Sequence, residues 1–172
     1  MTLHIRPATD ADWPAIWAVL QPVFRAGETY TFARDISEPN ARQAWMLVPA
    51  RTFVCTGLDG AVIGTYYIKP NQPGQGSHVC NCGYAVSPAA RGRGAASAMC
   101  RHSQDEAVAM GFRAMQFNCV VSTNEGAVRL WQQLGFAIVG TLPGAFAHPT
   151  RGDVDAYVMY KRLAGDQPPS HP

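Results

Sequence analysis

The sequence predicts an α/β fold with a mixed, mostly antiparallel central sheet of about seven strands flanked by about four helices. Three observations support this prediction. Segments with β-rich and helical patterns alternate along the chain. Asp59-Gly60 lies between two β-rich runs, which is a hairpin signal and gives antiparallel pairing. A strand–helix–strand segment over residues 78–121 requires a right-handed crossover if its two strands are parallel.

The N-terminal segment predicts a strand followed by an amphipathic helix. Residues 3–6 form a short β-rich run. Thr9 or Asp10 can cap the helix, whose apolar side chains recur at helical spacing as far as Phe24. Pro14 falls in the first turn, where proline is tolerated.

A loop, a second helix and the hairpin follow. Residues 27–32 break the helical pattern, and Glu38 opens a short helix that reaches Leu47. The two hairpin strands are predicted over residues 52–58 and 61–69, before a loop rich in proline, glycine and amides.

The second half of the chain continues the alternation of strands and helices. Strands are predicted at 78–86 and 114–121, and helices at 95–110 and 124–134. Each of these helices is followed directly by glycine, which is a common helix stop.

The C-terminal part predicts two more strands and a tail. The strands cover residues 136–141 and 154–160, with a loop over 142–153 between them. Residues 1–163 are interpreted as a single domain, and 164–172, which are polar and rich in proline, as a flexible C-terminal tail.

Composition excludes several classes of protein. With 47% hydrophobic and 15% charged residues in 172, the chain can form a full core and is not extensively disordered. The net charge of +2 comes without a dense Lys/Arg block, so nucleic acid is not an expected partner. No signal-peptide pattern or membrane-length apolar run is present, which predicts a cytoplasmic protein with no membrane partner.

The five cysteines are interpreted as buried free thiols. Their number is odd, and most of them lie in apolar or strand-like runs. Cys80-Asn81-Cys82 lacks a second Cys/His pair at zinc-site spacing, so no metal is expected.

The turn Arg91-Gly92-Arg93-Gly94-Ala95-Ala96 carries the clearest functional signal. It lies between a predicted strand and the start of a predicted helix, where backbone N–H groups lack intrahelical partners and the helix dipole favours anions. Gly94 and Ala96 have little side-chain bulk, and Arg91 and Arg93 add positive charge. The turn indicates a diphosphate ligand. An ordinary strand-to-helix turn with solvated arginines is the alternative.

With its flanking strand and helix, this turn resembles the GNAT superfamily of acyl-CoA N-acyltransferases. The family pattern is Gln/Arg-x-x-Gly-x-Gly/Ala, which Arg91, Gly94 and Ala96 match. A second family block is matched at the predicted helix 124–134, and the order of elements agrees over residues 3–162. The matching residues of that block are Asn124, Ala127, Leu130 and Gly135-Phe136.

The resemblance implies that acetyl-CoA is the cofactor. Its pyrophosphate would lie on the turn, and its pantetheine arm would enter a gap where the parallel strands 78–86 and 114–121 splay apart. Asn124 would bond the cofactor; the alternative is a plain helix N-cap, which Asn favours and which is compatible with that role. The implied cofactor-binding residues are Ala85, Val86, Arg91, Gly92, Arg93, Gly94, Ala95, Ala96, Asn124 and Trp131.

A closer similarity connects the chain to a branch that contains fungal proline-analogue (azetidine-2-carboxylate) acetyltransferases. It rests on Phe117-Asn118, on the run from Val120 to Asn124 and on the run from Val139 to Phe146. In that branch two asparagines, matching Asn81 and Asn118, line the acceptor site. In-sheet amides bonded to the backbone are the alternative interpretation.

The catalytic groups are harder to assign from the residues. Asn118, Asn81 and Glu28 are the catalytic candidates; the amides can orient the acceptor or a relay water, whereas Glu28 is either a base or a solvated loop carboxylate. His78 has a side chain suited to proton transfer, but a lone histidine more often has a structural role. Many family members carry a tyrosine acid after the helix-motif leucine, but Trp131 stands there, and indole has no useful acid chemistry.

Two predicted loops carry aromatic residues suited to a small, partly apolar acceptor. Tyr30, Phe32 and Phe146 are the substrate-binding candidates beside the two asparagines, with His148 near them and Arg151 able to meet a carboxylate; ordinary loop packing is the alternative. A covalent route through Cys119 or Cys80 is disfavoured, because no histidine–carboxylate arrangement supports it.

These inferences together predict an N-acetyltransferase that moves an acetyl group from acetyl-CoA directly to a small amine, such as an amino acid or its analogue. The alternatives are a protein or peptide N-acetyltransferase and a non-catalytic acyl-CoA-binding module. The resemblance also allows a homodimer, for which the sequence offers no interface patch.

Overall fold

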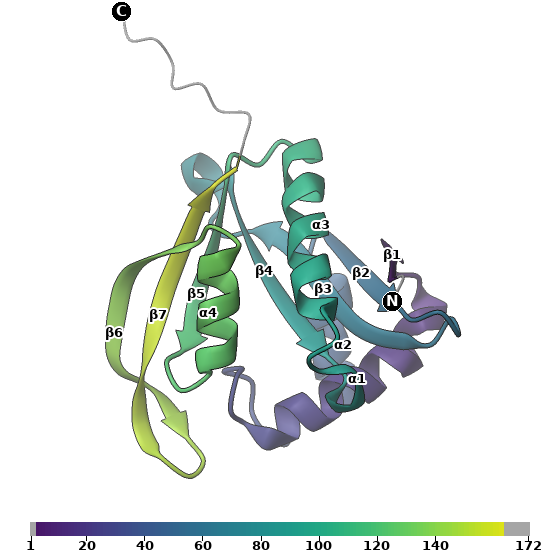
Figure 1. The fold of residues 1–172 in the computed structure, drawn as a ribbon, viewed down its shortest axis with the longest axis horizontal. Coiled ribbons are helices and arrows are strands. Elements are labelled where there is room, and N and C mark those ends of the chain that lie inside the picture. The colour runs from purple at the N-terminus through teal and green to yellow at the C-terminus, as the bar shows by residue number, and fades with distance from the viewer. Residues whose placement is uncertain (1–2, 164–172) are drawn as a thin grey trace, which may run out of the picture.

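The computed structural model describes residues 3–163, so the predicted tail from residue 164 lies outside the described residues. Seven strands form one sheet in the order β1-β2-β3-β4-β5-β7-β6 (Figure 1). The strands are β1 (His4–Pro7), β2 (Arg51–Thr56), β3 (Val62–Pro70), β4 (Val79–Val86), β5 (Ala114–Val121), β6 (Ala137–His148) and β7 (Gly152–Arg162). The α-helices are α1 (Trp13–Ala26), α2 (Glu38–Arg42), α3 (Ala95–Ala109) and α4 (Glu125–Gln133). The predicted fold class is confirmed.

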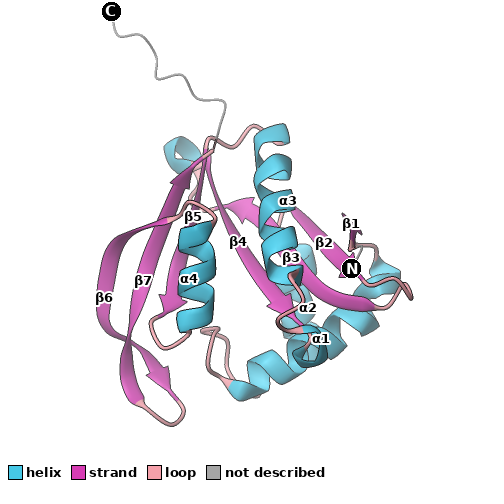
Figure 2. Ribbon diagram, viewed as in Figure 1, coloured by secondary structure: helices cyan, strands magenta, loops and turns pink. Residues whose placement is uncertain are grey.

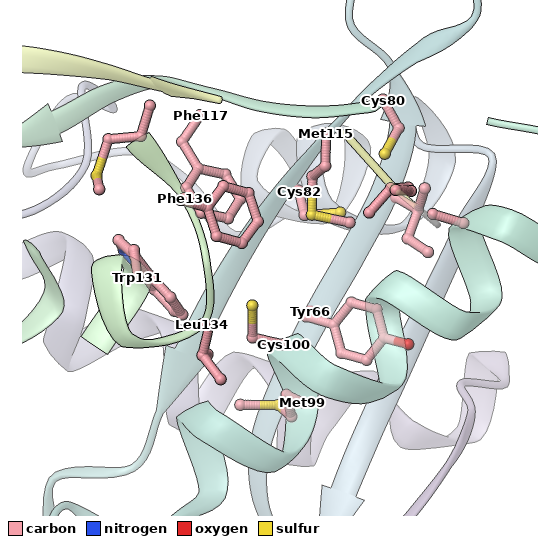
Figure 3. Packing of buried hydrophobic residues seen from close by; sticks show 14 of the residues in the cluster. Tyr66, Cys80, Cys82, Met99, Cys100, Met115, Phe117, Trp131, Leu134 and Phe136 are labelled. Carbon is pink, nitrogen blue, oxygen red and sulfur yellow. The ribbon is translucent and has the colours of Figure 1, made fainter. Parts of the chain in front are cut away.

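The helices cover both faces of the sheet and give the molecule two apolar cores. Helix α1 and the segment around Trp45 pack on one face, where Ile16, Leu20 and Trp45 are fully buried. Helices α3 and α4 pack on the opposite face, where Met99, Cys100 and Trp131 join the larger core (Figure 3). A sheet buried on both faces explains why its central strands are almost continuously apolar. Within residues 3–163, no helix is long and apolar enough to span a membrane.

Strands β4 and β5 form the only parallel pair in the described sheet, and their pairing is short. It consists of Val79 with Ala114 and Cys80 with Met115. Beyond these pairs the two strands continue without a shared ladder, β4 to Val86 and β5 to Val121. The sheet therefore opens between its central strands toward their carboxyl ends, as Figure 1 shows.

The segment predicted as a loop over residues 142–153 is largely strand, and that prediction was wrong. β6 runs to His148, and β7 begins at Gly152 (Figure 2). The segment contains Pro143 and Gly144, residue types that interrupt central strands, but β6 is an edge strand that pairs with β7 alone. Two register irregularities accommodate these residues, and an edge strand tolerates proline because one side of it needs no ladder partner.

The second predicted helix changes its winding partway along. Residues Glu38–Arg42 are α-helical, and Gln43–Leu47 continue as a π-helical turn. The wider turn carries Trp45 into the core, where its indole nitrogen donates to the Thr65 hydroxyl at 3.1 Å. Four of the five cysteines are buried free thiols, and Cys119 is half-buried, which confirms the prediction for this set.

Candidate functional site

A groove of about 890 Å³ follows the opening between β4 and β5. It reaches from the turn before α3, past the carboxyl ends of the two strands, to the loop after α1 and the turn between β6 and β7. The predicted residues that line it are Glu28, Tyr30, Phe32, Asn81, Ala85, Val86, Arg91, Gly92, Ala96, Asn118, Asn124 and Trp131. Segments far apart in the sequence thus meet along one continuous cavity.

The turn before α3 is built from backbone in a conformation that glycine favours. Gly92 has a φ of 74° and Gly94 a φ of 82°, and Gly94 is the N-cap of α3 without a side-chain cap. A Cβ built at either glycine would meet no atom within 4 Å, so the space beside both backbones is open. A helix N-terminus with open space and two nearby arginines suits a phosphate group. Arg93, Gly94 and Ala95 belong to this turn but do not line the groove themselves.

Asn124 begins α4 on the opposite wall of the groove. Its Oδ1 accepts a hydrogen bond from the Ala127 amide at 3.3 Å, as an N-cap does. Within residues 3–163 its side-chain amide nitrogen has no hydrogen-bond partner, so the cap leaves a donor available toward the groove. The two interpretations of Asn124 are compatible.

Trp131 packs against two aromatic rings, those of Tyr84 and Phe117. Its ring centroid lies 5.1 Å from that of Tyr84 and 5.3 Å from that of Phe117, and only 8% of the residue is exposed. Figure 3 shows Trp131 among the residues of the larger core. The indole closes the α4 side of the groove and is part of the larger core. Burial also raises the pKa of Tyr84 well above its usual value, and its hydroxyl is paired with Ser103 at 2.7 Å.

Asn81 bridges β4 and β5 where their pairing ends. Its Nδ2 donates to the Gln116 carbonyl at 2.9 Å, and its Oδ1 accepts from the Tyr67 hydroxyl at 3.3 Å. Asn81 is buried, and burial raises the pKa of Tyr67 to about 12, so this phenol remains a neutral donor at neutral pH. Gly83 permits the arrangement, because a Cβ there would lie 2.6 Å from the Tyr67 ring.

Asn118 lies at a bulge in β5. The register with β7 shifts between Phe117 and Val120, so β5 carries one more residue than β7 across this interval. The Asn118 Nδ2 donates to Asn71 Oδ1 at 2.7 Å, and its Oδ1 accepts from Gln116 Nε2 at 2.8 Å. Three exposed or half-buried amides thus form a hydrogen-bonded chain, of which Asn118 lines the groove.

The loop after α1 covers the groove from the side of the smaller core. The Tyr30 hydroxyl donates to the Tyr84 carbonyl at 2.8 Å, which ties the loop to β4, and burial raises the pKa of Tyr30 well above its usual value. The Tyr30 ring stacks on Phe32 with centroids 5.9 Å apart. Glu28 lines the groove on the same loop and has no hydrogen-bond or ion-pair partner within residues 3–163.

Two sequence candidates lie away from the groove. Phe146 is buried in the β6–β7 hairpin and does not line the cavity, although His148 and Arg151 of that hairpin do. His78 faces the loop before β4, where its Nδ1 lies 3.0 Å from the Gln75 carbonyl. Cys119 does line the groove, but burial raises the pKa of its thiol, which leaves it a poor nucleophile.

Sequence reasoning missed four side chains near Asn81 and Asn118: Tyr67, Lys69, Asn71 and Gln116. The first two lie on the groove face of β3, two residues apart, and Lys69 pairs directly with Asn81 in the ladder. Strand alternation placed Tyr67 and Lys69 on one face. The sequence carried no signal for the register that sets them beside Asn81.

The model of the family described as "Acetyltransferase (GNAT) family" matches residues 13–136. N-acetyltransferase aca1 from Schizosaccharomyces pombe is 38% identical over 113 residues, which is 64% of this chain; the match spans 54%, about half, of aca1.

Solved structures give the same result over the whole fold. A GCN5-related N-acetyltransferase from Kribbella flavida has a TM-score of 0.89 and 47% identity, covering 94% of this chain and 98% of that one. A phosphinothricin acetyltransferase from Sinorhizobium meliloti, in complex with AcCoA, has a TM-score of 0.86 at 22% identity, covering 99% and 95%; at that identity the likeness shows the fold alone.

Proposed function

The chain belongs to the GNAT family of acetyltransferases, and we propose that it transfers an acetyl group from acetyl-CoA directly to the amine of a small acceptor, such as an amino acid or an amino-acid analogue. One observation carries the proposal. A single groove reaches from the turn before α3 to the polar side chains of Asn81 and Asn118. Such a groove holds a long cofactor at one end and a small second substrate at the other.

The turn end suits coenzyme A. Open space beside Gly92 and Gly94, the free N-terminus of α3 and Arg91 together provide for a pyrophosphate. The unpaired edges of β4 and β5 beyond Cys80 provide backbone groups for the pantetheine arm, at Ala85 and Val86 among others. Asn124 offers its side-chain amide from α4. When bound, the cofactor supplies the activated acetyl thioester.

The protein's own groups favour direct transfer over an acyl-enzyme. Burial raises the pKa of Cys119, so a thiolate is disfavoured there. Glu28 is the carboxylate on the groove wall that is free to accept the proton of an acceptor ammonium, directly or through water. Trp131 is held by packing and cannot protonate the leaving thiolate, so solvent at the open groove is the proton source.

The acceptor end favours a small substrate. Tyr30 and Phe32 stack over the groove, and the Tyr30 hydroxyl is bonded to β4, so the covering loop is tied to the sheet. On the remaining wall, the groove-lining amides of Asn81 and Asn118 are held in place by hydrogen bonds to Gln116 and Asn71. The resemblance to the proline-analogue branch, in which asparagines matching Asn81 and Asn118 line the acceptor site, also implies a small acceptor.

Acetyl-CoA consumption across a panel of free amino acids, azetidine-2-carboxylate, polyamines and peptides tests the proposal, with products mapped by mass spectrometry. We expect turnover with a free small amine. Turnover confined to peptides would instead identify a protein or peptide N-acetyltransferase. Tight acetyl-CoA binding without turnover on any amine would identify a non-catalytic acyl-CoA-binding module.

A further inference from the structure

We propose that Lys69 binds a carboxylate of the acceptor, so that the substrate is an amine with an acidic group close to the reacting nitrogen. The inference rests on the proposed function and assigns a charged contact outside both family motifs. It concerns the pocket at the start of the opening between β4 and β5, where Lys69 lines the groove beside Asn81.

The position of Lys69 is set by the sheet. Lys69 stands directly opposite Asn81 in the β3–β4 ladder and is half-buried. Its Nζ lies 5.5 Å from the centroid of the Tyr67 ring, a cation–π distance that holds the ammonium over the groove face. A lysine in this setting has less rotational freedom than one on an open surface.

The charge of Lys69 is uncompensated within the described part of the chain. No carboxylate lies within 4.0 Å of its Nζ, and no acceptor atom completes a hydrogen bond to it. An ammonium has three donors and no acceptor, so a half-buried one that lacks protein partners is suited to an anion.

The amides beside Lys69 are already engaged. Asn81 uses its oxygen and one N–H on Tyr67 and Gln116. Asn118 likewise uses its oxygen and one N–H on Gln116 and Asn71. These bonds fix the wall of the pocket, whereas the ammonium of Lys69 is left to meet the ligand.

The two arginines that line the groove differ from Lys69 in position or solvent exposure. Arg91 belongs to the turn before α3, at the opposite end. Arg151 is exposed on the turn between β6 and β7, where solvent screens its charge. Arg151 therefore serves as the matched control for a groove cation outside the sheet.

The experiment compares each L-amino acid with its carboxamide as acceptor for the wild type, Lys69→Met, Lys69→Arg and Arg151→Gln. Lys69→Met is expected to lower kcat/KM for the amino acid about tenfold or more, through a higher KM. The kcat/KM for the carboxamide should change less than about twofold. Lys69→Arg should retain the preference for the amino acid over its carboxamide. Arg151→Gln should change this preference less than Lys69→Met does. The Kd for acetyl-CoA should be unchanged in all three variants. Circular dichroism verifies folding, and Lys69→Gln replaces the Met variant if that one unfolds.

The outcomes separate this inference from the function on which it rests. Wild-type turnover with an acid-to-carboxamide ratio that Lys69→Met leaves unchanged would overturn the assignment of Lys69 alone. A loss on both acceptors equally would also overturn it, because that loss indicates a structural role. A wild type that acetylates no acceptor of the panel would overturn the proposed function and this inference together.

Discussion

The two ends of the groove are built from different parts of the chain. The turn end uses backbone: positive-φ glycines, the N-terminus of α3 and the unpaired edges of β4 and β5. The proposed acceptor end is lined by side chains from three strands and two loops, among them Asn81, Asn118 and Lys69. A site made of backbone groups tolerates substitutions at most positions except its glycines. A site made of side chains changes the ligand that it binds with each substitution. One cofactor site can thus serve different acceptors across a family.

The sharpest test of the turn end is Gly94→Glu. A side chain at a φ of 82° is strained by about 1–2 kcal/mol, and the new carboxylate would put negative charge at the N-terminus of α3, where the phosphate is proposed to bind. We expect acetyl-CoA affinity to fall more than about 100-fold, since two charge-assisted hydrogen bonds are worth about 3 kcal/mol or more. Isothermal titration calorimetry measures the loss.

Gly60→Glu provides the matched control for that variant. Gly60 has a φ of 77°, also faces open space, and lies in the β2–β3 turn, which does not line the groove. Both variants should lose similar stability, and only the Gly94 variant should lose acetyl-CoA. Equal affinities in the two variants would show that the phosphate site lies elsewhere.

The same contrast explains how much the sequence could predict. Gly94, Asn124 and the alternation of strands identify the turn end, because backbone geometry leaves glycine and capping residues at fixed spacing. The acceptor end depends on register. Asn71 reaches Asn118 across 47 positions in sequence, and the bulge in β5 sets where Asn118 lies. No local pattern encodes those contacts.

The strand ends show a related limit. Pro143 and Gly144 lie in the segment predicted as a loop, and both residue types weaken central strands. The structure makes them part of β6 because an edge strand accepts irregular pairing. Whether a strand lies at the edge is a property of the whole sheet, so a local pattern cannot predict it.

Within the acceptor end, substitutions of the two asparagines should differ in how much they lower the free energy of unfolding. Asn81→Ala leaves the Gln116 carbonyl and the Tyr67 hydroxyl without their buried partner, and we expect a loss of about 2 kcal/mol in the free energy of unfolding. Asn118→Ala affects exposed amides and should cost less than about 0.5 kcal/mol. Urea unfolding measures both. Equal losses would contradict the bridging role of Asn81, and acceptor kcat/KM should fall in both variants.

High pH should ionise Tyr67 at the acceptor end and lower the stability that its neutral form contributes, whereas the arginines of the turn keep their charge. The pKa of Tyr67 is raised to about 12 by burial, against about 10 in an unfolded chain, so the folded state favours the neutral phenol. This contribution is complete below pH 10 and is lost as pH rises toward and through 12. Tyr67→Phe should therefore reduce the loss of stability between pH 8 and pH 11 by about 1 kcal/mol. Parallel curves of unfolding free energy against pH for the variant and the wild type would contradict this linkage. The arginines of the turn remain charged over the whole pH range.

The smallest effect on turnover is expected at Trp131, which lies between the two ends. If the indole only packs against Tyr84 and Phe117, Trp131→Phe keeps an aromatic contact and lowers stability by about 1 kcal/mol, while kcat changes less than about twofold. Trp131→Tyr is the companion variant, because it places a phenol at the position where many family members have one. A kcat that falls more than about tenfold in a folded Trp131→Phe variant, with acetyl-CoA affinity unchanged, would give the indole a part in the reaction. Equal kcat in the wild type and both variants would mean that the leaving thiolate needs no acid from α4, and that chemistry in this groove depends on the acceptor end alone.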